Sequence, residues 1–305
     1  MRRAVLTALT AMSAASLVLA ACGSDSNDSS STEAATAAPG GTEAGTATTA
    51  VADATACAKG KTLTDGTLTV ATGNPAFSPW VIDDKPESGQ GFESAVAYAV
   101  AEKMGFDQAH VKWVRTGFDE AIQPGKKNFD FNIQQYTITP EREKTVSFSE
   151  PYYTTNQALV TFANSKYATA KTIADLKSAK LGAATGTTSL AFINDVIKPS
   201  SEASVYDTNE DAKAALEANQ IDGIVVDLPT SFGIAYGDLK DGTVAGQFTR
   251  EEGEKGDELG MLFDLHNPLV ACVNAALDQL KAGGTLKQLE DKWLAGSTGA
   301  PVIAR

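Results

Sequence analysis

The chain has 305 residues, of which 43% are hydrophobic and 21% are charged, ordinary values for a folded protein with one or two domains. Its formal net charge is −13. An acidic surface of this kind repels phosphate backbones, which argues against a nucleic-acid partner. Beyond the N-terminal stretch, no segment of the sequence is apolar enough to span a bilayer.

The N-terminal residues predict a secretory signal peptide at residues 1–21. Arg2 and Arg3 precede an apolar stretch, and polar low-complexity sequence follows it immediately, unlike the flank of a membrane span. The ending Leu19-Ala20-Ala21-Cys22 resembles a bacterial lipobox, in which the cysteine is acylated, palmitate being the expected chain, and becomes the first mature residue. The alternative is an ordinary signal peptide with an unrelated cysteine. Removing residues 1–21 takes two positive charges from the total of −13 and leaves −15.

Residues 22–58 are predicted to form a disordered tether behind the lipidated Cys22. The segment consists almost entirely of small, hydroxyl and acidic residues, so it cannot bury enough apolar surface to fold. We therefore expect an extracytoplasmic protein that is anchored to the cell membrane by its N-terminal lipid and touches the membrane through that lipid only.

The chain has three cysteines. If Cys22 carries lipid, Cys57 and Cys272 remain, and an even number of thiols in an oxidising compartment favours a disulfide. The bond would join the N-terminal arm to a C-terminal helix. The alternative is two buried free thiols.

The folded part alternates predicted strands and helices. A first unit does so at residues 67–72, 92–104, 111–114, 118–123 and 129–136, after which a helix begins at Pro140. A second unit does so at residues 158–162, 172–178, 181–184, 189–196, 205–206, 210–218 and 221–226. Residues 268–294 are predicted to be helical, with a break at Gly283-Gly284. The pattern predicts two parallel α/β units whose polar strand ends face each other across a cleft.

Seven sequence blocks, in this order and spacing, carry a family resemblance between about residues 63 and 294. They are Phe77-Ser78-Pro79-Trp80, Gly91-Phe92-Glu93, Thr137-Ile138-Thr139-Pro140-Glu141-Arg142, Val146-Ser147-Phe148-Ser149-Glu150-Pro151-Tyr152-Tyr153, Thr185-Gly186-Thr187-Thr188, Ile221-Asp222-Gly223-Ile224-Val225-Val226-Asp227, and Gly284-Thr285-Leu286 to Trp293. On these blocks the chain resembles the amino-acid (family 3) class of type II periplasmic solute-binding proteins.

The resemblance implies an α/β, two-lobed periplasmic-binding-protein type II fold with hinge-linked lobes. Lobe 1 would comprise residues 59–157 plus 258–305, and lobe 2 residues 158–257. It further implies extracytoplasmic capture of a small α-amino acid and its delivery, by lobe closure, to the permease subunits of an ABC importer. We expect a monomer that needs no cofactor and no metal.

An α-amino acid presents a carboxylate and an ammonium group. A guanidinium suits the carboxylate because it donates two parallel hydrogen bonds, and the resemblance assigns this role to Arg142, helped by the backbone N–H of Thr137. Thr187 and Thr188, where a strand turns into a helix, would hold the same carboxylate from the other lobe. Asp227, directly after a buried strand, resembles the family residue that pairs with the ammonium. The alternatives are a surface arginine, a helix cap and a strand-end turn, respectively.

Aromatic and amide residues complete the predicted site. Phe77 and Phe118 align with rings that enclose the apolar part of the ligand, although each could equally pack in the core. Asn74 occupies a place that is often acidic in binders of basic amino acids and glutamine. Gln135 stands where the family usually has Gly or Ser, so its side chain would narrow the pocket or contact the ligand. Neutral Asn74 argues against a basic ligand, and the lack of a further arginine near the predicted pocket argues against an acidic one. Asn132, Gln134 and Gln135 make the strand before Thr137 polar, so we expect a polar, uncharged ligand side chain.

Three other classes of protein are alternatives to an importer component. A dehydratase-type enzyme would share the fold, but it needs a general acid facing the substrate, and neither His110 nor His266 neighbours the site motifs. A ligand sensor for a receptor remains open, whereas a ligand-free adhesin would not need Arg142 together with Asp227. The sequence predicts a binding protein that is not an enzyme.

Overall fold

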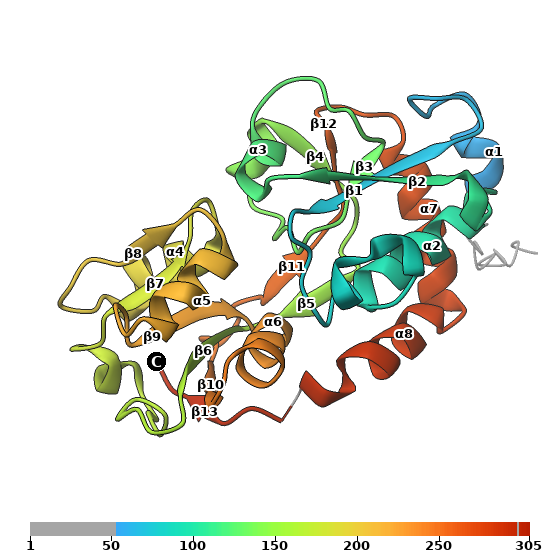
Figure 1. Ribbon diagram of the computed structural model, residues 1–305. Coiled ribbons are helices and arrows are strands. Elements are labelled where there is room, and N and C mark those ends of the chain that lie inside the picture. Colours follow the sequence, from blue (N-terminus) through green and yellow to red (C-terminus); the bar gives the residue numbers. More distant parts are fainter. Residues whose placement is uncertain (1–52, 298) are drawn as a thin grey trace, which may run out of the picture. The chain divides into compact units, whose positions relative to one another are not determined.

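A computed structural model describes residues 53–297 and 299–305 of the chain (Figure 1). The predicted signal peptide, the lipidation of Cys22 and most of the predicted tether lie outside these residues. Among the helices of the described ranges, none combines the length and the apolar character that crossing a bilayer requires.

The first sheet has the strand order β2-β1-β3-β12-β4. Strand β1 is parallel to β2 and β3, whereas β12 is antiparallel to β3 and β4. The bounds are Leu68–Gly73 for β1, Val111–Thr116 for β2, Phe131–Asn132 for β3, Val146–Phe148 for β4 and Leu262–Asp264 for β12. Every residue of β1 is buried, as expected of a strand that lies inside a sheet covered on both faces.

Four helices pack against the first sheet and complete its core. They are α1 (Ala54–Ala58), α2 (Phe92–Lys103), α7 (Val270–Ala282) and α8 (Thr285–Leu294). Helix α2 buries Phe92, Val96 and Val100, which the 3.6-residue period places on one face. The sequence therefore predicted the helices at α2, α7 and α8 correctly, whereas α1 was expected to belong to the tether.

The second sheet has the strand order β13-β10-β6-β9-β7-β8. The bounds are Gln157–Phe162 for β6, Leu181–Ala184 for β7, Ser204–Tyr206 for β8, Gly223–Asp227 for β9, Gly242–Phe248 for β10 and Val302–Ile303 for β13. Strand β9 alternates between two cores, with Ile224 and Val226 in one and Val225 in the other. Asp227 thereby stands at the carboxyl end of a strand that is buried on both faces.

Shorter helical segments fill the connections. The α-helices are α3 (Phe118–Ile122), α4 (Thr188–Phe192), α5 (Asn209–Glu217) and α6 (Leu228–Phe232), with π-helical turns at Ile193–Ile197 and Gly233–Asp238. The 3-10 turns are Ile82–Asp84, Pro86–Ser88, Gln108–His110, Arg142–Lys144, Ile173–Leu176 and Ala295–Ser297.

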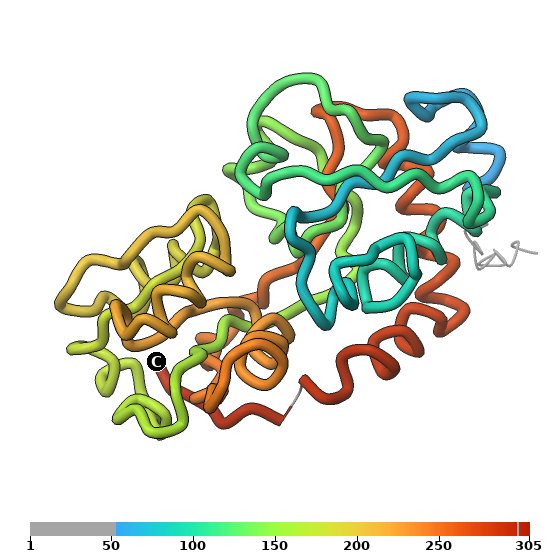
Figure 2. Tube along the Cα trace, in the orientation of Figure 1, coloured from blue at the N-terminus to red at the C-terminus, as the bar shows by residue number. Residues whose placement is uncertain are grey.

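Two antiparallel strands carry the chain between the two sheets (Figure 2). Strand β5 (Tyr153–Thr155) follows β4 and leads into β6, and β11 (Asp257–Leu259) follows β10 and leads into β12. The α/β fold with two lobes joined by crossing strands, as predicted, is confirmed.

The two ends of the described chain differ from the predicted division. Residues 258–305 were all expected in lobe 1, but β13 pairs with β10 of the second sheet, and Ile303 is fully buried in its core. The chain therefore passes between the sheets a third time, after α8. At the other end, the tether was expected to reach residue 58, whereas Ala54–Ala58 is helical, capped by the side chain of Asp53.

Two local predictions around the site are also wrong. The strand expected at 129–136 is reduced to Phe131–Asn132, because Gln135 adopts φ 50°, which an extended strand does not allow. The helix expected from Pro140 is a single 3-10 turn, Arg142–Lys144. Strand β4 begins at Val146, so no room remains for a longer helix.

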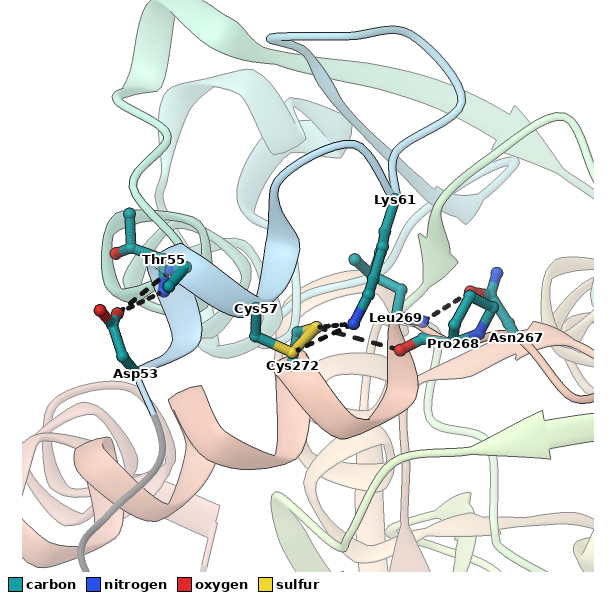
Figure 3. Close-up of a disulfide and its surroundings, with 9 residues drawn as sticks. Asp53, Thr55, Cys57, Lys61, Asn267, Pro268, Leu269 and Cys272 are labelled. Carbon is teal, nitrogen blue, oxygen red and sulfur yellow. Dashed lines mark hydrogen bonds between the residues drawn. A yellow bond between two sulfur atoms is a disulfide. The ribbon is translucent and has the colours of Figure 1, made fainter.

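The predicted disulfide is present in the structure. Cys57 of α1 is bonded to Cys272 of α7 across 215 residues of sequence (Figure 3). Cys272 is fully buried in the first core, and Cys57 packs against that core. The bond joins the N-terminal arm, at α1, to the C-terminal helix α7, as expected.

Candidate functional site

A cavity of about 390 Å³ is lined by residues that follow strands of both sheets. This volume lies in the range of small-molecule sites. Eight of the nine predicted ligand residues line it, namely Asn74, Phe77, Phe118, Gln135, Arg142, Thr187, Thr188 and Asp227. Thr137 is not part of the lining, but it contacts two residues that are.

Arg142 is a fixed cation at one side of the cavity. It is 8% exposed, and its two terminal nitrogens donate to the carbonyl of Thr137 at 2.6 Å and to that of Gly186 at 2.9 Å. Burial lowers its pKa, yet a guanidinium stays charged at any physiological pH. Two of its five N–H groups are engaged, which leaves donors for an anionic group in the cavity. Because Gly186 follows β7 of the second sheet, the Arg142 side chain links the two lobes.

The hydroxyl groups of Thr187 and Thr188 make different contacts. The Thr187 hydroxyl accepts from the N–H of Leu190 at 3.1 Å and donates to the carbonyl of Ala184 at 2.7 Å, so it caps α4. The hydroxyl of Thr188 lies 3.3 Å from that of Thr137, across the two lobes. Of the two hydroxyls, that of Thr188 is therefore better placed for a ligand.

Asp227 shares an amide with a second carboxylate. The side-chain nitrogen of Gln157 donates to Asp227 at 3.0 Å and to Asp257 at 2.5 Å, while its oxygen accepts from Ser189 at 2.7 Å. The Asp227 side chain makes no capping hydrogen bond to α6, so its carboxylate does not stabilise the start of that helix. Strand β11 supplies Asp257, which links this cluster to the strands between the lobes.

The two clustered carboxyls hold their protons more tightly than usual. Burial, together with the negative charge of Asp257, raises the pKa of Asp227 well above its usual range, and Arg142 opposes this only in part. Burial likewise raises the pKa of Asp257. Both effects mean that a negative charge lacks sufficient compensation here. A cation placed beside Asp227 would supply it.

Sequence reasoning missed three further acids of the cavity. Asp119, Glu120 and Asp207 also line it. Among the residues described as lining the cavity, Arg142 is the single basic side chain, against these three acids and Asp227. The formal charge of the lining is therefore −3. A signal was available, because two of the acids directly follow Phe118 in the sequence.

The aromatic residues serve both the core and the cavity. The ring of Phe118 stacks on that of Tyr136 with centroids 4.5 Å apart, and the Arg142 guanidinium carbon lies 5.3 Å from the Phe118 centroid. Phe77 also lines the cavity. In residues 53–297 and 299–305, no group of three or more His, Cys, Asp or Glu side chains is arranged to hold a metal ion.

Two lobes joined by crossing strands, with a polar cavity lined from both, define a two-lobed solute-binding protein. The family model of bacterial extracellular solute-binding proteins, family 3, matches residues 68–296, and the chain belongs to this family.

Among its relatives, "ABC transporter arginine-binding protein 1" of Escherichia coli (strain K12) is 33% identical over 208 residues, 67% of this chain and 81% of the relative. The solved structure "An ancestral arginine-binding protein bound to arginine" is 28% identical with a TM-score of 0.62, covering 75% of this chain and 98% of that one. "The ancestral amino acid-binding protein AncCDT-1, a precursor of cyclohexadienyl dehydratase" is 30% identical with a TM-score of 0.59, covering 75% and 95%.

Proposed function

We propose that this protein captures an α-amino acid with a positively charged side chain, arginine first, and delivers it to the permease subunits of an ABC importer. The observation that carries the choice of ligand is the charge of −3 on the cavity lining. An amino acid of neutral side chain engages Arg142 and Asp227 and adds no positive charge beside Asp119, Glu120 and Asp207. A cationic side chain is attracted by these three acids.

This proposal replaces the uncharged side chain expected from the sequence. The argument against a basic ligand rested on Asn74 alone, whereas three acids that it did not consider also line the cavity. Relatives named for arginine support the new choice. In the proposed binding mode, the ligand carboxylate contacts Arg142 and Thr188 and the ligand ammonium contacts Asp227. The ring of Phe118 covers the apolar part of the ligand side chain.

Lobe closure follows from the same contacts. Arg142 bonds the carbonyl of Gly186, and Thr137 meets Thr188, so the ligand carboxylate would sit between groups of both lobes. Binding would thus favour the closed form, which the permease would recognise. We further propose that the protein acts as a monomer outside the cytoplasm, anchored by lipid on Cys22.

We propose no catalysis, although one relative is described as a precursor of an enzyme. Asp227, whose pKa burial also raises, lines the cavity but serves the ligand ammonium in this proposal. Another carboxyl suited to acid chemistry is Glu93, because burial raises its pKa to about 7. It is not part of the cavity lining, and its oxygens accept hydrogen bonds from Gln135 and Tyr152. A general acid must reach the substrate, which Glu93 does not.

The test is calorimetric titration of the protein without residues 1–21 and with Cys22→Ser, against all common L-amino acids. We expect arginine to bind most tightly. Arg142→Lys keeps the charge but loses the planar fork, and it should weaken binding about a hundredfold. Lys144→Ala is the matched control, since Lys144 is exposed on the same 3-10 turn, and it should bind as the parent does.

A second set of variants tests the ligand's charge. A triple variant should bind arginine more weakly but should bind neutral amino acids at least as tightly as the parent does; it combines Asp119→Asn, Glu120→Gln and Asp207→Asn. Preference of the parent protein for an uncharged amino acid would overturn the proposed ligand. Recovery of a chemically changed ligand after incubation would overturn the absence of catalysis.

A further inference from the structure

We propose that Glu93, which lies outside the cavity, is a positioning residue for ligand binding: it holds Gln135 in a left-handed backbone conformation, with its side chain turned away from the ligand. This inference rests on the proposed function, because the ligand it serves is the amino acid of that cavity. The side-chain amide of Gln135 donates to Glu93, whereas the sequence led us to expect it to narrow the pocket or contact the ligand.

The geometry joins the two residues twice. One oxygen of Glu93 accepts from the backbone N–H of Gln135 at 2.7 Å, and the other accepts from the side-chain amide of Gln135. The hydroxyl of Tyr152 donates to the first oxygen as well. Glu93 itself is fixed, because it is fully buried in the first turn of α2 and its own N–H donates to the carbonyl of Trp80 at 3.0 Å.

The conformation of Gln135 needs such a support. Its φ is 50°, in the left-handed region that L-residues other than Gly, Asn and Asp rarely adopt. Releasing a residue from that region to a right-handed or extended conformation shifts an equilibrium by about tenfold. Gln135 lines the cavity two residues before Thr137, whose carbonyl holds Arg142. A relaxed Gln135 would therefore disturb the cavity wall and the carboxylate site together.

The surroundings of Glu93 indicate that hydrogen bonds alone hold it. The ionisable groups that interact with it are Tyr152, Tyr136 and Asp227, none of them a cation. Burial raises the pKa of Glu93 to about 7, and the bonds from Tyr152 and Gln135 act in the opposite direction. All three bonds to Glu93 come from donors, so the carboxylate form is the one that clamps Gln135.

The experiment compares arginine affinity in four proteins: the parent, Glu93→Gln, Gln135→Gly and the double variant. Glutamine at 93 keeps the volume but offers one acceptor where the carboxylate offers two, so we expect about tenfold weaker binding. Glycine adopts a positive φ without strain. In the Gln135→Gly background, the change at Glu93 should therefore alter affinity less than about twofold.

Asp130→Asn is the matched control. Asp130 is buried in the same lobe and accepts from the N–H groups of Leu63 and Thr69 at 2.7 and 2.6 Å. Its loss should lower the melting temperature and leave affinity unchanged. If Glu93→Gln behaves like Asp130→Asn, or if its loss of affinity persists in the glycine background, Glu93 has a general structural role and the proposal is wrong.

A ligand-free measurement keeps this inference separate from the proposed function. In NMR spectra of the protein labelled at glutamine nitrogens, the backbone and side-chain signals of Gln135 should move strongly on Glu93→Gln, and those of Gln134 much less. Unmoved Gln135 signals would overturn the clamp. Failure of the parent to bind any amino acid, with the Gln135 signals moving as expected, would overturn the proposed function and the ligand role of the clamp, but not the clamp itself.

Discussion

Acidification should weaken ligand binding, because the ammonium group of the ligand needs an ionised Asp227. Burial and the charge of Asp257 raise the pKa of Asp227 well above its usual range in the empty protein. At a pH below that raised value, Asp227 carries a proton that must leave when the ammonium arrives. Ligand binding then releases protons, and the dissociation constant rises as the pH falls.

The magnitude follows from the number of protons displaced. One proton released per ligand makes affinity fall about tenfold for each unit of pH. Asp227 and Asp257 share the amide of Gln157 and interact electrostatically, so they titrate as a coupled pair. A cationic ligand lowers the pKa of both, which brings the limit to about a hundredfold per unit if both protons leave.

Calorimetry measures this release directly. Titrations from about pH 8 to about pH 5, in buffers of different ionisation enthalpy, give the number of protons exchanged per ligand bound. Asp227→Asn should bind more weakly at the upper end and should release about one proton fewer than the parent. A dissociation constant that stays the same over this range, or proton uptake on binding, would refute the predicted coupling of ligand binding to proton release from Asp227.

Three further predictions concern stability and closure. Cys57→Ser with Cys272→Ser should lower the free energy of unfolding by about 3–5 kcal/mol in denaturant titrations, since the bond closes a loop across 215 residues; arginine affinity should not change, and a loss below about 1 kcal/mol would contradict the entropic reasoning. Trp80→Phe and Thr230→Val each break the buried inter-lobe hydrogen bond of 2.8 Å and should each cost about 1 kcal/mol, with a coupling in the double variant that additive effects would disprove. The pKa of Glu93 rises from 4.5 to about 7 on folding. The stabilisation of the folded state by this group is therefore complete below pH 4.5 and is lost as the pH rises through about 7, about 3 kcal/mol in all. Glu93→Gln should flatten this part of the curve of unfolding free energy against pH, and an unchanged curve would argue against the shift.

The arrangement of most of the site could be predicted because it depends on a local rule. Polar residues at the carboxyl ends of parallel strands gather at one edge of a sheet, and Asp227 at the end of β9 and Thr188 after β7 both line the cavity as expected. Arg142 was found by its motif, although the helix expected around it is only a 3-10 turn. The role of each residue toward a ligand stays a prediction.

The rest of the site depends on pairings that no local pattern encodes. Gln157 and Asp257 come together because β5 and β11 pair across about a hundred residues of sequence. Neither segment contains a pattern that predicts which strand it pairs with. The pairing of β13 with β10 is equally non-local. From the sequence, Glu93 was interpreted only as a residue at the start of a helix. Its contact with Gln135 depends on the positive φ of Gln135, which the sequence does not predict for a glutamine.

The charge of the cavity explains why the ligand itself should govern closure. Without a ligand, Asp119, Glu120 and Asp207 line the same cavity while Arg142 supplies the one positive charge of the described lining. Because like charges repel one another, the empty closed form is penalised. An arginine adds two positive groups and one negative group, so it offsets that repulsion. Glutamate adds the opposite balance, and it should bind more weakly than any neutral amino acid of similar size.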